Sequence, residues 1–102
     1  MIKNVNELKP MRSVRQVGLM IQASVDHVVE RFLDPKNQQK GTHINTSPVE
    51  MYEHIIKESI ECKQAYMDNE GFPREIEELS DTILLCVMRI DQIKKLQEKG
   101  VW

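Results

Sequence analysis

Four acidic residues with a repeated spacing are the side chains in this sequence best suited to chemistry. Glu58 and Glu61 form one pair, and Glu78 and Asp81 form a second pair further along the chain. Residues three apart lie on one face of an α-helix, so each pair presents two carboxylates in the same direction. Carboxylate oxygens suit hard divalent cations. Mg²⁺ fits best because it usually keeps several waters and is completed by substrate phosphate, and Mn²⁺ is a plausible substitute.

The chain between the two pairs contains the sequence Asn69-Glu70-Gly71, which is typical of a helix end because Asn and Gly tolerate left-handed backbone angles. One acidic pair lies about ten residues before this turn and the other about ten residues after it. At about 1.5 Å per residue, both pairs stand roughly 15 Å from the turn of an antiparallel helical hairpin. The four carboxylates would then meet at one height, where their repulsion favours neutralisation by cations or protons.

A single pair of acids at this spacing is weak evidence for a site. The same spacing occurs at Glu50 and Glu53 and again at Glu75 and Glu78, and such pairs are common on solvated helix faces. Two pairs at matched heights on neighbouring helices are much more specific, and that arrangement carries the prediction.

The sequence pattern predicts three helices that would position these acids, and hence an all-α fold. Apolar spacing and end signals place them at about residues 11–33, 48–69 and 73–99, within one domain covering residues 1–102. The second begins at a capping box, Ser47-Pro48-Val49-Glu50, and Pro73 opens the third. The stripe of the first helix consists of Val14, Val17, Ile21, Val25, Val28 and Phe32. We expect an antiparallel bundle of these three helices.

The middle of the third helix predicts self-association. Residues 83–88 are apolar on every side of the helix, and a helix of that kind is normally buried on all sides. One chain of 102 residues can hardly bury it alone. We therefore expect a homodimer or homotetramer in which a second copy completes a four-helix core.

Residues 34–47 form a polar connection of a length often associated with function, because helix–helix connections usually contain about 2–8 residues. A solvated connector is an equally good interpretation. The net charge of −2 and the absence of a basic stripe argue against binding of a nucleic-acid polymer. Without a secretory signal or an apolar run of about 18 residues, we expect no membrane association and a cytoplasmic location.

The two acidic pairs resemble the E-x-x-E…E-x-x-D motif of the all-α NTP pyrophosphohydrolases. This superfamily includes the MazG proteins, the dimeric dUTPases and phosphoribosyl-ATP pyrophosphatase. The segments 56–61 (IKESIE) and 77–85 (EELSDTILL) look like its two motif helices, and the resemblance extends from Val49 to about Leu96. The first predicted helix fits the order of elements but carries no motif.

The resemblance implies an activity and a set of catalytic residues. Glu58, Glu61, Glu78 and Asp81 would bind Mg²⁺, and water would attack the α-phosphorus of a (deoxy)nucleoside triphosphate. The products would be the monophosphate and pyrophosphate, which suits an enzyme that cleans the nucleotide pool. One of the glutamates would orient or deprotonate the water, and the sequence does not choose between them.

Residues that would hold the nucleotide are less specific, and for each of them an ordinary surface role is the more usual one. Four basic residues could reach phosphates: Lys57, Arg89, Lys94 and Lys40. His43 and Asn45 could contact a base edge, and Tyr66 or Trp102 could stack on a base. Asp91 is a further candidate because relatives often carry an Asn or Asp downstream of the motif. Some relatives that hydrolyse dCTP have an aromatic residue where this chain has Leu85, so base preference does not carry over.

Two other functions remain open. The same fold and metal could act on an unusual substrate such as a phosphoribosyl-nucleotide. Alternatively, the chain could be a catalytically silent helical interaction module. Acids at all four motif positions argue against the silent module, because a scaffold gains nothing from clustered charges of one sign.

Overall fold

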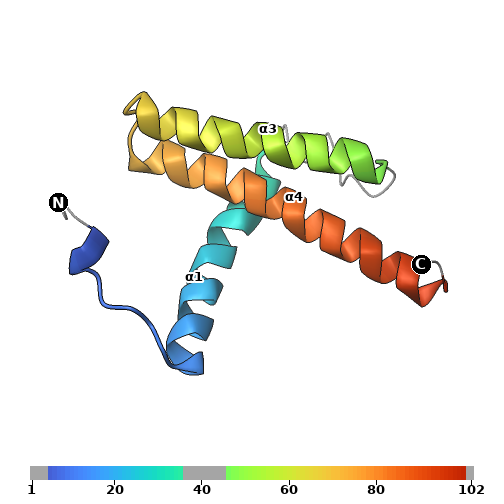
Figure 1. The fold of residues 1–102 in the computed structure, drawn as a ribbon, viewed down its shortest axis with the longest axis horizontal. Helices are drawn as coiled ribbons and strands as arrows, with labels where there is room; N and C mark the ends of the chain where they lie inside the picture. The colour runs from blue at the N-terminus through green and yellow to red at the C-terminus, as the bar shows by residue number, and fades with distance from the viewer. Residues whose placement is uncertain (1–4, 36–45, 101–102) are drawn as a thin grey trace.

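The computed structural model describes residues 5–35 and 46–100, and every regular element within them is helical (Figure 1). The elements are the short 3₁₀ helix η1 (Val5–Glu7) and the α-helices α1 (Val14–Leu33), α3 (Pro48–Met67) and α4 (Phe72–Glu98). The described residues contain no strand, so the all-α prediction is confirmed for this part of the chain. None of the described helices has the length and apolar content needed to cross a membrane.

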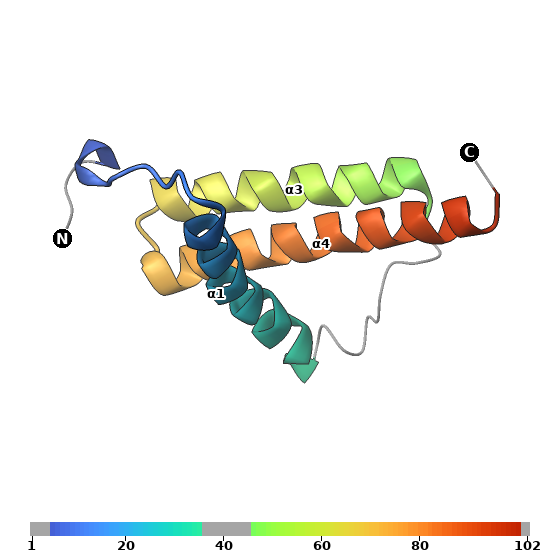
Figure 2. The ribbon, with the colours of Figure 1, turned by 90° about the horizontal axis from the view of Figure 1, so that it is seen from below.

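Helices α3 and α4 form the predicted antiparallel hairpin and lie side by side in both views (Figures 1 and 2). The turn between them contains Asn69 with φ 52° and Gly71 with φ 97°, the left-handed angles that the sequence suggested. The amide of Glu70 donates to the carbonyl of Ala65 at 3.1 Å and closes the end of α3. The turn therefore sets the height at which the residues of the two helices meet.

Side-chain caps fix where the helices begin. Helix α1 begins at Val14 rather than at residue 11, because Ser13 and Gln16 form a full capping box in which each side chain accepts from the other residue's backbone amide. In α3, the Ser47 hydroxyl accepts from the amide of Glu50 at 3.3 Å, which is one half of the box expected there. Helices α3 and α4 end at Met67 and Glu98, slightly before the expected ends.

Helix α1 lies across α4 instead of running along the hairpin (Figures 1 and 2). It packs against α4, and the described residues show no packing between α1 and α3. Its C-terminal part is the docked part: Val28 is 7% exposed and Arg31 reaches Asp81, whereas Val14 at the other end is 92% exposed. The antiparallel arrangement expected of all three helices is thus present in α3 and α4, while α1 crosses α4 and packs against it near the C-terminus of α1.

The described core is thin. Its buried apolar side chains are Val28, Met51, Ala65 and Leu85. Gln92 is buried as well, and its amide donates to the carbonyl of Thr46 at 2.7 Å, tying α4 to the segment that precedes α3. A core of this size leaves the stability of the chain sensitive to single truncations.

Replacing Met51 with Ala should therefore destabilise the protein strongly. Met51 is fully buried, and truncating a buried methionine costs about 2–5 kcal/mol through lost transfer energy and the cavity left behind. Urea denaturation followed by circular dichroism would measure this change. Val49→Ala is the matched control, because Val49 is 68% exposed and its truncation should stay within about 0.5 kcal/mol. Equal midpoints for the two variants would contradict the assignment of the core.

Candidate metal centre

Three of the four predicted acids converge between α3 and α4. Glu58 on α3 and Glu78 and Asp81 on α4 each place a carboxylate oxygen within 4.8 Å of the others. Glu78 is buried, and the other two are half-buried. These three residues therefore lie at the same height of the hairpin, as their spacing from the turn predicted. We call Glu58, Glu78 and Asp81 the acid cluster.

Glu61 lies beside the cluster rather than within it. The group of mutually close oxygens does not include Glu61, which acts on the cluster as a neighbour that raises the pKa of Glu58.

Glu78 has the most constrained environment of the four acids. Its residue surface is 4% exposed, and Oε1 forms an ion pair with Arg74 one turn earlier on α4. Its other oxygen, Oε2, is buried and has no hydrogen-bond partner among the described residues. Burial raises the pKa of Glu78, and the nearby charge of Arg74 opposes that change. An unsatisfied buried acceptor is costly, so this oxygen is a place where a cation would stabilise the structure.

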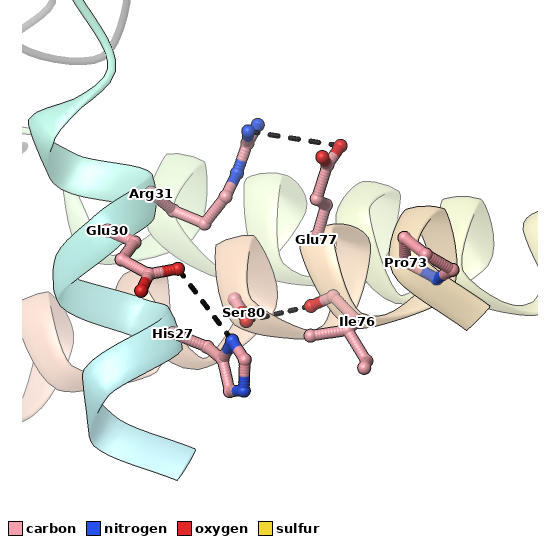
Figure 3. A pocket seen from close by; sticks show the side chains of 7 residues that line it. All are labelled: His27, Glu30, Arg31, Pro73, Ile76, Glu77 and Ser80. Carbon is pink, nitrogen blue, oxygen red and sulfur yellow. Dashed lines mark hydrogen bonds and ion pairs between the residues drawn. The ribbon is translucent and has the colours of Figure 1, made fainter. Parts of the chain in front are cut away.

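Asp81 is held by an arginine from the first helix. Arg31 Nε donates to Asp81 Oδ1 at 2.8 Å, and Nη2 donates to Oδ2 at 3.2 Å. Such two-pronged contacts are among the stronger hydrogen bonds in proteins. Arg31 Nη1 also lies 3.9 Å from Glu77 Oε2, the contact that Figure 3 draws. Both oxygens of Asp81 are thus engaged by a cation that belongs to the chain itself.

Arg31 and Arg74 were not among the residues predicted from the sequence. Arg74 could have been predicted, because it lies four residues before Glu78 on the same helix and such residues are neighbours. Arg31 lies fifty residues from Asp81, and only the crossing of α1 over α4 brings the two together. No local sequence pattern encodes that crossing.

The pKa of Glu58 rises from its ordinary value of 4.5 to about 7. Removal of the carboxyl group from water is the largest cause, and the hydrogen bond to Glu61 is the next. The negative charges of Glu61, Asp81 and Glu78 act in the same direction. At neutral pH a proton therefore resides on this part of the cluster for much of the time.

A hollow of about 440 Å³ lies beside the cluster, at the junction of α1 and α4 (Figure 3). Arg31 and Glu77 belong to its lining, while none of the four motif acids does. His27 and Glu30 come to it from α1, and the remaining lining residues are Pro73, Ile76 and Ser80 of α4. Arg31 thus lines the hollow and contacts the acid cluster at the same time.

Several other predicted residues do not meet the acid cluster. Arg89 lies 5.4 Å from the centre of the Tyr52 ring and donates to Gln92 at 2.6 Å. Asp91 pairs with Lys95 at 2.8 Å, and Lys94 is exposed in the same part of α4, more than three helical turns beyond Asp81.

Lys57 and Tyr66 are exposed on α3, although Lys57 is adjacent to Glu58 in sequence. Lys40, His43, Asn45 and Trp102 lie outside the described residues, so their roles stay predictions.

The donor set suits a divalent cation of the Mg²⁺ type. The three converging ligands are all carboxylate oxygens, and one of these carboxylates has a buried oxygen that nothing in the described chain satisfies. The geometry does not distinguish Mg²⁺ from Mn²⁺, which accepts the same ligands.

No protein-family model, curated protein or solved structure matches this chain. The relation to the MazG-like pyrophosphohydrolases is therefore a resemblance that rests on the two motifs and on the all-α arrangement that brings three of their acids together.

The raised pKa of Glu58 predicts a dependence of stability on pH in the metal-free protein. An acid whose pKa is higher in the folded state binds its proton more tightly when the protein is folded. The free energy of unfolding therefore decreases as the pH rises from about 4.5 through about 7. Melting temperatures in chelator between pH 5 and 8 should fall with rising pH, and Glu58→Gln should flatten this slope. Glu53→Gln, an exposed neutralisation on the same helix, should keep the parental slope. Parallel curves for the parent and Glu58→Gln would contradict the pKa.

Proposed function

We propose that this protein is a divalent-cation-dependent pyrophosphohydrolase that converts a (deoxy)nucleoside triphosphate to the monophosphate and pyrophosphate. The observation that carries the proposal is the meeting of carboxylates of Glu58, Glu78 and Asp81 from two helices, together with a buried, unsatisfied oxygen on Glu78. The resemblance of the two motif helices supports the substrate class and a role in cleaning the nucleotide pool.

Glu58, Glu78 and Asp81 would hold Mg²⁺ or Mn²⁺ through their carboxylate oxygens. When bound, such a cation neutralises phosphate oxygens and makes water a better nucleophile. The half-buried position of the cluster strengthens these electrostatic effects, because charges interact more strongly where water is partly excluded.

Glu61 is the acid best placed to accept the proton of the attacking water. It lies outside the group of three ligand oxygens, yet it is close enough to Glu58, a member of that group, to raise the pKa of Glu58. The oxygen of water forms a bond to the α-phosphorus, and the bond from the α-phosphorus to the bridging oxygen of the β-phosphate breaks. The proton passes to Glu61, and the electron pair leaves with pyrophosphate.

The hollow between α1 and α4 offers a place for the nucleoside. Its volume of about 440 Å³ lies within the range of about 300–1,000 Å³ that is usual for small-molecule sites. Arg31 lines the hollow and also contacts Asp81, so a nucleotide bound there would have its phosphates beside a guanidinium and close to the acids. A phosphate there would compete with Asp81 for the guanidinium, because Nε and Nη2 of Arg31 already donate to Asp81.

One observation favours the silent interaction module as the second candidate. Arg31 and Arg74 already pair with Asp81 and Glu78, so the chain neutralises part of its own acidic cluster without an ion. In that case the acids and arginines would form a structural network, and the protein would neither bind a divalent cation specifically nor hydrolyse nucleotides.

Product analysis with a panel of canonical and modified nucleoside triphosphates would separate the two candidates. With Mg²⁺ we expect monophosphate and pyrophosphate from at least one member, and no product in chelator. Glu78→Gln should lose both cation binding and activity, because it removes a buried ligand charge. Glu61→Gln should keep cation affinity within a few-fold while activity falls about 10²–10⁴-fold, as is usual for loss of a general base.

Glu53→Gln is the matched control, since this acid lies on the exposed surface of α3, and it should retain both properties. Unchanged activity in Glu78→Gln would exclude the cluster as the reaction centre. Absence of both turnover and cation binding in the parent protein would favour the structural network.

Replacing Arg31 with Gln should tighten the binding of the divalent cation. The guanidinium occupies both oxygens of Asp81, so a cation that uses Asp81 has to displace it. We expect the dissociation constant for Mn²⁺, measured by electron paramagnetic resonance, to fall about tenfold, which corresponds to about 1.4 kcal/mol. Arg15→Gln, an exposed change on the same helix, should have no effect. Weaker binding in Arg31→Gln would mean that Arg31 orients Asp81 for the cation instead of competing with it.

A further inference from the structure

The Arg31 side chain faces two parts of the molecule at once. Its Nε and Nη2 donate to the two carboxylate oxygens of Asp81, at 2.8 and 3.2 Å. It also lines the hollow between α1 and α4 (Figure 3). About a quarter of the side chain is exposed, since its relative accessibility is 24%, so a dissolved ligand can reach it. The guanidinium therefore lies at the border between the acid cluster and the open hollow.

The contact with Asp81 uses the edge of the guanidinium that would serve a phosphate. Two neighbouring donors suit a carboxylate or a phosphate equally, because both groups offer a pair of oxygens. A phosphate that took this edge would leave Asp81 without the arginine, and the Asp81 side chain is only 22% exposed. Separating a partly buried charge from its partner is costly. The hollow should therefore bind anions poorly in the metal-free chain.

A divalent cation at the acid cluster would change this balance, because it would use the same carboxylate. Asp81 is one of the three residues whose carboxylate oxygens converge, and Glu78, another of them, has a buried oxygen with no partner among the described residues. The cation would compensate the charge of Asp81 in place of Arg31. Two positive charges on one carboxylate repel each other, so the cation also favours departure of the guanidinium.

We propose that Arg31 exchanges partners when the cation binds, leaving Asp81 for a phosphate group in the hollow. The hollow then becomes an anion site in the cation-loaded protein alone. This exchange rests on the proposed cation site, and it imposes an order of binding in which the cation precedes the phosphate-bearing ligand.

The other charges around the hollow make Arg31 the deciding group. Among the described residues that line it, Arg31 is the one arginine or lysine. The lining acid Glu77 lies 3.1 Å from Arg74 Nη1, so α4 already neutralises it. The second lining acid, Glu30, is 73% exposed, and water and salt screen its charge. Whether the hollow attracts an anion therefore depends on where this one guanidinium points.

Helix α1 keeps other contacts with α4 when Arg31 leaves Asp81. Val28 of α1 is 7% exposed, and Arg31 Nη1 already lies 3.9 Å from Glu77 Oε2 on the side of the hollow. A change in the conformation of one long side chain is then sufficient for the exchange, and the hollow persists.

Pyrophosphate binding to the full chain in chelator tests whether Asp81 keeps Arg31 from anions. Isothermal titration calorimetry at pH 8, where Glu58 is mostly ionised, should detect little binding to the parent. Asp81→Asn removes the competing charge and should bind pyrophosphate about tenfold more tightly than the parent. Adding Arg31→Gln to Asp81→Asn should abolish this gain. Glu58→Gln is the matched control, because it removes a charge from the same cluster but leaves the contact between Arg31 and Asp81 in place.

The Nε–H resonance of Arg31 in nuclear magnetic resonance spectra reports the exchange in the parent protein itself. Arg31→Lys identifies this resonance by its loss. In chelator the hydrogen bond to Asp81 should shift it away from the position of exposed arginines. Saturation with Mg²⁺ should return it toward that position, and pyrophosphate in the presence of excess Mg²⁺ should shift it again. Circular dichroism checks the folding of Asp81→Asn, and the resonance of the parent decides if that variant does not fold.

An Arg31 resonance that stays in place while Mg²⁺ saturates the protein would overturn the exchange and leave the proposed hydrolase intact. The exchange would also be excluded if folded Asp81→Asn showed no gain, or if Glu58→Gln gained as much, because general loss of negative charge would then explain the binding. A parent that binds no divalent cation would overturn the exchange and the proposed function together.

Discussion

The paired contact between Arg31 and Asp81 is the interaction on which the arrangement of this molecule depends. It joins the C-terminal part of α1 to the middle of α4, and α1 has no packing with α3 among the described residues. The same contact neutralises one member of an acid cluster whose charges would otherwise repel across the hairpin. The position of the first helix and the electrostatics of the site are therefore coupled through a single guanidinium.

This coupling explains how a small chain tolerates several acids in partly buried positions. Arg74 pairs with Glu78, Arg31 pairs with Asp81, and burial raises the pKa of Glu58 so that it is partly protonated at neutral pH. One oxygen of Glu78 is left unsatisfied, so the compensation within the described chain is incomplete. A divalent cation would complete it, and ligand binding would then contribute to the stability of the folded chain.

Helix α4 organises the structure because its different faces have different partners. One face packs against α3, and a second face receives α1 around Ser80 and Asp81. A third face carries aliphatic side chains that stay exposed, among them Leu79 and Val87. Residues 83–88 are apolar on all sides in the sequence, and the structure separates them into Leu85, which is buried within the chain, and others that stay exposed, such as Ile83 and Val87.

The sequence by itself determined the features that depend on local spacing. The cap at Ser47 and the left-handed angles at Asn69 and Gly71 act within a few residues, so the start of α3 and the hairpin turn were readable. The height of the acidic pairs followed from the helical rise. Only the tertiary structure decided that Glu61 stands beside the cluster, that α1 crosses α4, and that Arg31 holds Asp81. These outcomes depend on how side chains pack between elements that are distant in sequence, and no periodicity along the chain records that packing.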